Sequence, residues 1–252
     1  MLGFMAVSGI FGLQNLQKLD IAVKFPEEIY CDIPVQLTVQ LATKRSILNH
    51  YLLTLHLAGV VTGFPIIRPG ERKEQKVLVT FSSRGAGTVT RAAVSSPFPV
   101  NFFVRSNLFS LNAGYLVFPR PKPLPGGWSG GDPAEIGSSS HLHKGSSGET
   151  ESIDHYTGKE PFRQIHWKLS ARHDELLVKE MAEETGEPVT IDPDLLPGAV
   201  EERLGHAAYL INRLMPEGRA VGLKLGEKLI PPGITRGHRL KMLGELARYA
   251  PD

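Results

Sequence analysis

The chain has 252 residues, which is more than the roughly 100–200 residues of a usual domain, so we expect one large domain or two modest ones. The 28 Lys and Arg nearly balance the 26 Asp and Glu, and no long basic block is present, which argues against nucleic acid as a partner. A single cysteine, Cys31, excludes an intramolecular disulfide framework and a multi-cysteine zinc site. Its Tyr-Cys-Asp-Ile-Pro setting is more typical of the approach to a strand than of a catalytic thiol.

The first residues form an apolar stretch. Residues 2–13 carry no charge, but a membrane-spanning helix needs roughly 20 apolar residues. A basic region before the stretch and a small-residue cleavage site after it are both missing, so it does not fit a signal peptide. Two interpretations remain open: a packed N-terminal helix, or the end of a transmembrane helix, which we favour and assign to residues 1–18. Lys18 and Lys24 would then favour a cytoplasmic location for the adjoining domain.

Residues 19–119 read as a series of short strands. Val35, Leu37, Val39 and Leu41 alternate with polar residues, which is the period of a half-buried strand. Similar patterns predict further strands around 53–57, 77–82, 89–94, 100–105 and 115–118, with a turn at 83–87. About seven strands in a hundred residues are typical of an Ig-like antiparallel β-sandwich. Since there is no Cys…Trp…Cys pattern, we predict the architecture and not a true immunoglobulin domain.

A change of composition marks the next segment. Gly, Pro and Ser occupy 18 of the 33 positions from 120 to 152, too many for the segment to bury its own core. We therefore predict a linker between two domains there. His141 and His143 form a His-x-His pair, but without a third ligand metal binding is the less favoured interpretation.

The last hundred residues, 153–252, change their period. Strands are predicted at 176–179, 188–191, 220–225 and 228–230, with Pro231-Pro232-Gly233 ending the last of them. Apolar residues at a spacing of three to four predict helices over 200–214 and around 240–247. Alternation of strand and helix implies a small α/β layer with partly parallel strands. The fold class is thus multidomain α+β: a β-sandwich followed by a small α/β domain.

The densest set of polar and aromatic residues lies just before these elements, between residues 153 and 184. Gly158 permits a turn that other residues resist. Arg163, Lys168 and Arg172 offer donors for carboxylates, carbonyls or a phosphate, and Trp167 offers a large ring to bury. His166 has no recognisable partner for acid–base chemistry nearby, so we favour a structural role for it.

This segment resembles the signature of the DUF58 family (domain of unknown function 58). The matching residues are Tyr156, Gly158, Arg163, Ile165, His166, Trp167, Lys168, Ser170, Ala171 and Arg172, followed by Leu177-Val178-Lys179-Glu180. The resemblance implies membrane helices at the N-terminus, a β-sandwich, a linker and a von Willebrand factor A-like domain. It also implies an inner or cytoplasmic membrane location and a MoxR-type AAA+ ATPase as protein partner.

Two departures from the family pattern affect these expectations. Lys159 stands where the family has an acidic turn residue, which reverses the charge there. Many relatives also carry an Asp-x-Ser-x-Ser metal site after a strand, whereas this chain has Asp192-Pro193-Asp194-Leu195-Leu196 and lacks both serines. We expect a shortened von Willebrand A-like domain that has lost its metal site, with Asp192 and Asp194 as less favoured metal ligands. No cofactor is expected.

Three functions are compatible with these residues. The leading hypothesis is a non-catalytic, membrane-associated scaffold, with the signature residues either contacting a partner or, as we favour, buttressing the domain internally. The alternative is a metal-dependent hydrolase that uses His155, His166, Asp192 and Asp194, which requires these groups to converge around an ion. Anion or nucleic-acid binding by the signature is disfavoured because acidic residues follow it closely, namely Asp174, Glu175, Glu180, Glu183 and Glu184.

Overall fold

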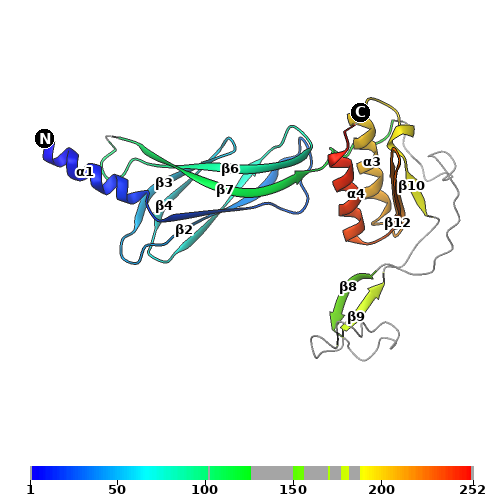
Figure 1. The fold of residues 1–252 in the computed structure, drawn as a ribbon, viewed down its shortest axis with the longest axis horizontal. Coiled ribbons are helices and arrows are strands. Elements are labelled where there is room, and N and C mark those ends of the chain that lie inside the picture. Colours follow the sequence, from blue (N-terminus) through cyan, green and yellow to red (C-terminus); the bar gives the residue numbers. More distant parts are fainter. Residues whose placement is uncertain are drawn as a thin grey trace. The chain divides into compact units, whose positions relative to one another are not determined.

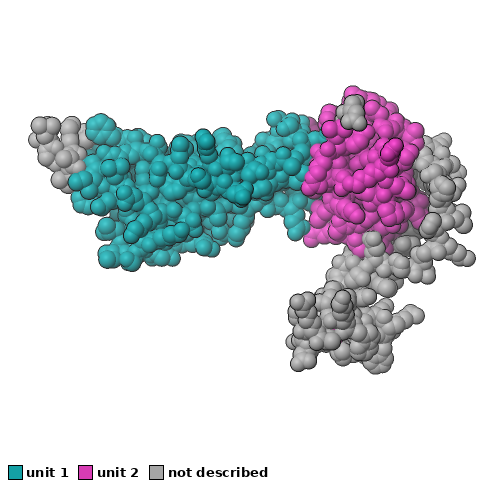
Figure 2. All heavy atoms as spheres, viewed as in Figure 1, with its two compact units in different colours: residues 1–117 teal, residues 118–252 magenta. Residues whose placement is uncertain are grey.

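The computed structural model describes residues 2–101, 103–125, 150–155, 170, 177–181 and 188–250. The chain divides into two compact units, Met1–Val117 and Phe118–Asp252, which are coloured separately in Figure 2. The described elements combine helices with mostly antiparallel strands, so the protein belongs to the α+β class.

The first unit contains two antiparallel sheets (Figure 1). One sheet has the strand order β1-β2-β5 and the other has the order β4-β3-β6-β7. The strands are β1 (Leu19–Lys24), β2 (Val35–Thr43), β3 (His50–Leu57), β4 (Val60–Ile67), β5 (Arg72–Val79), β6 (Gly85–Ser96) and β7 (Arg105–Val117).

The core of this unit comes from alternate residues of both sheets. In β2, Leu37, Val39 and Leu41 are almost fully buried, which confirms the alternation predicted from the sequence. Leu53, Leu55 and Leu57 of β3 belong to the same apolar cluster, as do Val77 and Val79 of β5. Because the inward side chains of the two sheets form one cluster, the sheets make a two-layer sandwich.

Two local predictions for this unit were wrong. Among the described residues of 100–105 no strand precedes Arg105, where β7 begins, because residues 97–101 form a turn in which the Asn101 N–H donates to the Pro97 carbonyl. The turn expected at 83–87 ends earlier, since β6 already begins at Gly85. Gly87 lies within β6 and leaves space for Tyr115, because a Cβ at this position would lie 2.3 Å from the Tyr115 ring.

A helix, α1 (Leu2–Asn15), precedes the sandwich and lies at one end of it (Figure 1). Its last residues enter the core: Asn15 and Leu16 are 2% and 4% exposed. Among the described residues, no helix has the length and apolar character needed to cross a membrane. The transmembrane interpretation of residues 1–18 therefore stays a prediction.

The second unit contains a three-stranded sheet with the order β10-β11-β12. β10 and β11 are parallel, as expected, and α3 connects them, while β12 is antiparallel to β11. A short 3-10 turn, η3 (Pro193–Leu195), follows β10. The other elements are β10 (Val189–Ile191), α3 (Val200–Leu214), β11 (Val221–Leu225), β12 (Lys228–Gly233) and α4 (Arg236–Arg248).

The two helices bury the apolar faces that their spacing predicted. Leu204, Ile211 and Leu214 of α3 are at most 1% exposed, and Leu243 and Leu246 of α4 are fully buried. Thr235 begins α4 by accepting the His238 N–H at 3.2 Å, a typical N-cap contact.

The sequence pattern placed the end of the last strand too early. β12 continues through Pro231 and Pro232 to Gly233. Since β12 is an edge strand, residues without an N–H are tolerated on its open side.

Both margins of the predicted linker carry structure. At its start, the Lys122 N–H donates to the Gly205 carbonyl of α3 at 3.0 Å. At its end, residues 150–152 belong to β8 (Thr150–His155), which pairs antiparallel with β9 (Leu177–Met181).

Candidate functional site

Asp192 lies where strand β10 ends, the edge at which α/β sheets usually bind ligands. Its carboxylate is buried, with the side chain 9% exposed. One oxygen, Oδ1, accepts the backbone N–H of Asp194 at 3.1 Å and so caps η3. The other, Oδ2, lies 3.0 Å from the ammonium of Lys224 on the neighbouring strand β11. A lysine of the chain itself therefore supplies the positive charge at this carboxylate.

Asp194 has a different partner. Its Oδ1 accepts a hydrogen bond from the guanidinium of Arg203 on α3 at 3.2 Å. Each of the two candidate metal ligands is thus paired with a separate cation. Within the described ranges, no three His, Cys, Asp or Glu side chains gather as a metal site.

The buried histidines of the second unit donate hydrogen bonds to backbone carbonyls of other segments. His206 Nδ1 donates to the Lys122 carbonyl at 2.8 Å, and His238 Nε2 donates to the Val221 carbonyl at 2.8 Å. A carbonyl oxygen only accepts, so the proton in each bond is on the histidine. Both rings therefore fasten one segment to another: residue 122 to α3, and α4 to β11.

The family-like signature lies almost entirely outside the described residues. Of the candidate positions Tyr156, Gly158, Arg163, His166, Trp167, Lys168, Ser170 and Arg172, the structure describes Ser170, which is buried at 6% exposure. The strands on either side are described: His155 ends β8 and pairs with Leu177, the first residue of β9. The segment 156–176 therefore starts and finishes at adjacent positions of one antiparallel pair. The side chain of His155 also lies outside the described part.

A polar cluster that the sequence pattern did not predict joins α1 to the sandwich. The Asn15 side chain acts like a peptide group toward β3: its Oδ1 accepts the Tyr51 N–H at 2.9 Å, and its Nδ2 donates to the Tyr51 carbonyl at 2.8 Å. Nδ2 also donates to the Ser96 hydroxyl at 2.9 Å. With one residue contacting both β3 and β6, the end of α1 is firmly fixed. The one signal in the sequence was a polar Asn at the end of an apolar stretch.

His50 completes this cluster. Its ring is fully buried, and Nδ1 donates to the Asn15 carbonyl at 2.7 Å. The opposite nitrogen, Nε2, lies 2.7 Å from the Thr43 hydroxyl, which also accepts the Arg45 N–H. Burial lowers the pKa of His50; the Asn15 carbonyl partly offsets this, and the charge of Arg45 lowers it further. The neutral ring with its proton on Nδ1 satisfies all of these contacts.

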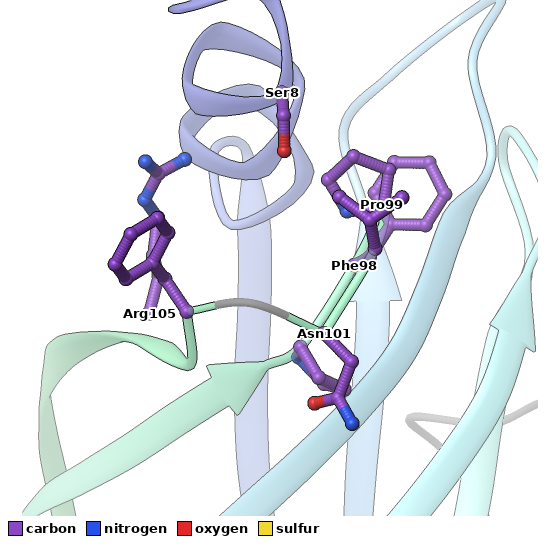
Figure 3. Close-up of a pocket in the computed structure, with 8 residues that line it drawn as sticks. Ser8, Phe98, Pro99, Asn101 and Arg105 are labelled. Carbon is purple, nitrogen blue, oxygen red and sulfur yellow. The ribbon is translucent and has the colours of Figure 1, made fainter. Parts of the chain in front are cut away.

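A small hollow separates α1 from the β6–β7 connection (Figure 3). Arg105 stands beside the helix and donates to the Gly9 carbonyl, while Phe98 and Pro99 form part of the lining. The helix approaches closely because it presents glycine: a Cβ at Gly12 would lie 2.5 Å from Arg105 Nη1. The cavity volume is about 10 Å³, the size of one water molecule, so the hollow is too small for a cofactor or substrate.

No family model matches the chain, and no curated protein matches it.

Proposed function

We propose that this chain is a non-catalytic, membrane-associated scaffold that recruits a protein partner, a MoxR-type AAA+ ATPase. The observation that carries the proposal is the pairing of Asp192 with Lys224 and of Asp194 with Arg203. A side-chain cation at each carboxylate competes with a metal ion for the same oxygens, which counts against a metal site there. Surfaces, rather than reactive groups, are then left to perform the function.

The architecture supports a domain pair like that of the family which the signature resembles. Strand orders β1-β2-β5 and β3-β6-β7 correspond to A-B-E and C-F-G of an Ig-like sandwich, but β4 pairs with β3 instead of lying beside β5. The parallel β10–α3–β11 unit is compatible with a shortened von Willebrand A-like domain.

The hydrolase alternative would use His155, His166, Asp192 and Asp194 around a metal ion. The ion pairs of the two aspartates count against it, and no contact among the described residues favours it. Elemental analysis of the purified full chain is the direct check. A stoichiometric divalent metal that Asp192→Asn removes would support the hydrolase and contradict the scaffold proposal.

A pull-down tests the scaffold proposal. The tagged full chain is incubated with a purified MoxR-type AAA+ ATPase, and the retained ATPase is quantified. We expect wild type to retain the ATPase and Trp167→Ala and Arg172→Ala to reduce retention at least severalfold. The matched controls are Trp128→Ala, the other tryptophan of the chain, and Lys241→Ala, an exposed position on α4. No retention by the wild-type chain would contradict the proposed partner.

Circular dichroism of the same variants separates the two roles of the signature. If Trp167→Ala keeps the wild-type spectrum and unfolding midpoint but loses the ATPase, the signature contacts the partner. If it loses both, the signature buttresses the domain internally. A variant that unfolds while Trp128→Ala remains folded would identify that internal role.

A further inference from the structure

Over residues 8–15, helix α1 (Leu2–Asn15) packs through a glycine and an asparagine and exposes its large apolar side chains. Over residues 8–15, the buried positions are Gly12 and Asn15, whereas Ile10, Phe11 and Leu13 are 50–58% exposed. A helix that packs on a protein core in water normally does the reverse, burying its large apolar residues. The outer side of α1 is therefore suited to an apolar environment.

The two connections nearest to α1 carry further exposed apolar side chains. The β2–β3 connection, residues 44–49, begins where the Lys44 N–H donates to the Lys18 carbonyl at 2.8 Å. The β6–β7 connection, residues 97–104, touches α1 at the hollow of Figure 3. Their exposed large apolar side chains are Ile47 (83%), Leu48 (53%), Val100 (39%), Phe103 (61%) and Val104 (67%).

Positive charge is also concentrated at the α1 end of the sandwich. The connections at the α1 end carry four basic residues, Lys18, Lys44, Arg45 and Arg68, and one acidic residue, Glu71, which pairs with Lys73. Asp20, just inside the end, faces Lys44 at 3.9 Å.

The opposite end of the sandwich has acidic connections with few exposed apolar side chains. These connections are residues 25–34, 58–59 and 80–84. They carry three acidic residues, Glu27, Glu28 and Asp32, against Arg84. Among their described large apolar side chains, only Ile33 is exposed, at 39%. Most of the exposed apolar side chains and the excess positive charge thus lie at the α1 end, whereas Val61 and Leu78 are the exposed apolar side chains just inside the opposite end.

We propose that the α1 end of the sandwich docks on the surface of an anionic phospholipid bilayer. The docking face consists of Ile10, Phe11, Leu13, Ile47, Leu48, Val100, Phe103 and Val104. Lys18, Lys44, Arg45 and Arg68 lie in connections at the same end of the sandwich. Apolar side chains enter the interface between headgroups and acyl chains, while basic residues remain at the level of the phosphates. The inference rests on the membrane association proposed above and adds that two connections of the sandwich take part in it.

Charge complementarity selects lipid over a second copy of the chain. Residues 1–117 contain eleven Lys and Arg against six Asp and Glu, a formal net charge of +5. Two identical basic faces would repel one another, whereas an anionic bilayer attracts each of them. The fixed attachment of α1 through Asn15 keeps helix and connections on one side, so they can meet a bilayer together.

Vesicle co-sedimentation of the full chain tests the docking face. We expect strong binding to vesicles of phosphatidylcholine with phosphatidylglycerol, weak binding to phosphatidylcholine alone, and weaker binding when salt is added. The double variant Ile47→Ser/Leu48→Ser should reduce partitioning about tenfold or more, because two exposed apolar side chains are lost. The matched control is Val61→Ser/Leu78→Ser, which removes two comparably exposed apolar side chains from β4 and β5.

A fluorescent reporter locates the contact. An environment-sensitive dye is attached at Ile47→Cys in a Cys31→Ser background, and a second protein carries it at Ser83→Cys, in the connection at the opposite end. Anionic vesicles should shift the emission of the dye at position 47 to the blue and leave the dye at position 83 unchanged. Both proteins must retain the wild-type circular dichroism spectrum.

The outcomes separate this inference from the proposed function. If wild type binds anionic vesicles but the Ile47/Leu48 variant binds equally and the dye at position 47 stays silent, the docking face is wrong and membrane association through α1 stands. Equal binding to both vesicle types overturns the requirement for anionic lipid. If wild type binds neither, the docking face and the proposed membrane association both fail.

Discussion

His50 illustrates how single buried residues of this chain are committed to structure. Both ring nitrogens have partners, the Asn15 carbonyl and the Thr43 hydroxyl, and the ring has no access to solvent. Asp192 is similar, with one oxygen used to cap η3 and the other paired with Lys224. His50 and Asp192 therefore each connect separate segments of the fold through their side chains.

The first prediction concerns pH. Because burial lowers the pKa of His50, the unfolded chain binds a proton at this residue at a higher pH than the folded chain does. The free energy of unfolding should therefore fall as pH drops below about 6.5, the ordinary histidine value, and this loss should level off below the folded-state pKa. The slope from one such group is at most about 1.4 kcal/mol per pH unit.

Urea unfolding between about pH 7 and 5 measures this effect, with His50→Asn as the comparison. Asparagine keeps a donor near the Asn15 carbonyl but does not titrate. The variant should be less stable at neutral pH and show a shallower dependence on pH than wild type. Equal slopes in the two proteins would contradict the assignment to His50.

At the scale of elements, glycine residues allow helices to pack closely against neighbouring segments. Gly12 lets α1 lie against Arg105, and Gly205 lets the segment before the linker lie against α3. At Gly205 a Cβ would be 2.7 Å from the Arg120 carbonyl, a contact that backbone atoms cannot relieve without moving. Hydrogen bonds from Lys122 and His206 hold the segment at this distance.

The second prediction is that Gly205→Ala destabilises the second unit by about 1–3 kcal/mol, the usual cost of an added methyl group in a packed site. Gly237→Ala is the matched control: it also lies in a helix, but a Cβ added there would meet no other atom within 4 Å. Alanine there should be neutral or stabilise by up to about 1 kcal/mol through helix propensity. Urea unfolding followed by helical circular dichroism distinguishes the two, and equal effects would show that the close approach is unimportant.

At the scale of the whole molecule, the two units differ in core and in charge. Each has its own buried apolar residues, and residues 118–252 carry 17 basic and 20 acidic residues, a formal net charge of −3, against +5 for residues 1–117. The near-neutral total of the chain therefore hides a basic half and an acidic half. The positive charge of the first unit agrees with the proposal that this unit binds an anionic phospholipid surface.

The third prediction is made at this scale. Lys224→Met leaves the buried Asp192 carboxylate without its cation and should lower the stability of the second unit by about 1–3 kcal/mol. Adding Asp192→Asn should recover part of the loss, because the unpaired charge is then removed. Hydrogen exchange resolves the units: protection should fall in α3 and α4 but not in the strands of the first unit. A uniform loss of protection would mean that the units unfold together.

The alternation of apolar residues was enough to predict several strands and both C-terminal helices. Leu37, Val39 and Leu41 are buried as their period of two requires, and Leu204, Ile211 and Leu214 are buried as the helical period requires. The predictions based on glycine and proline were wrong at two places. Gly87 was assigned to a turn but lies in β6, where it makes room for Tyr115. Pro231 and Pro232 were expected to end a strand but belong to the edge strand β12. These roles depend on neighbours distant in the chain, which local patterns do not contain.

The sequence by itself determined several strands, such as β2 and β3, and the helices α3 and α4, because periodicity and turn chemistry act over a few residues. Only the tertiary structure decided what the polar residues do: that Lys224 meets Asp192, that Asn15 joins α1 to β3 and β6, and that exposed apolar side chains gather at one end of the sandwich. The physical reason is the short range of polar interactions. Hydrogen bonds and ion pairs act at about 3 Å, and chain folding alone brings residues 32 to 96 positions apart within that distance.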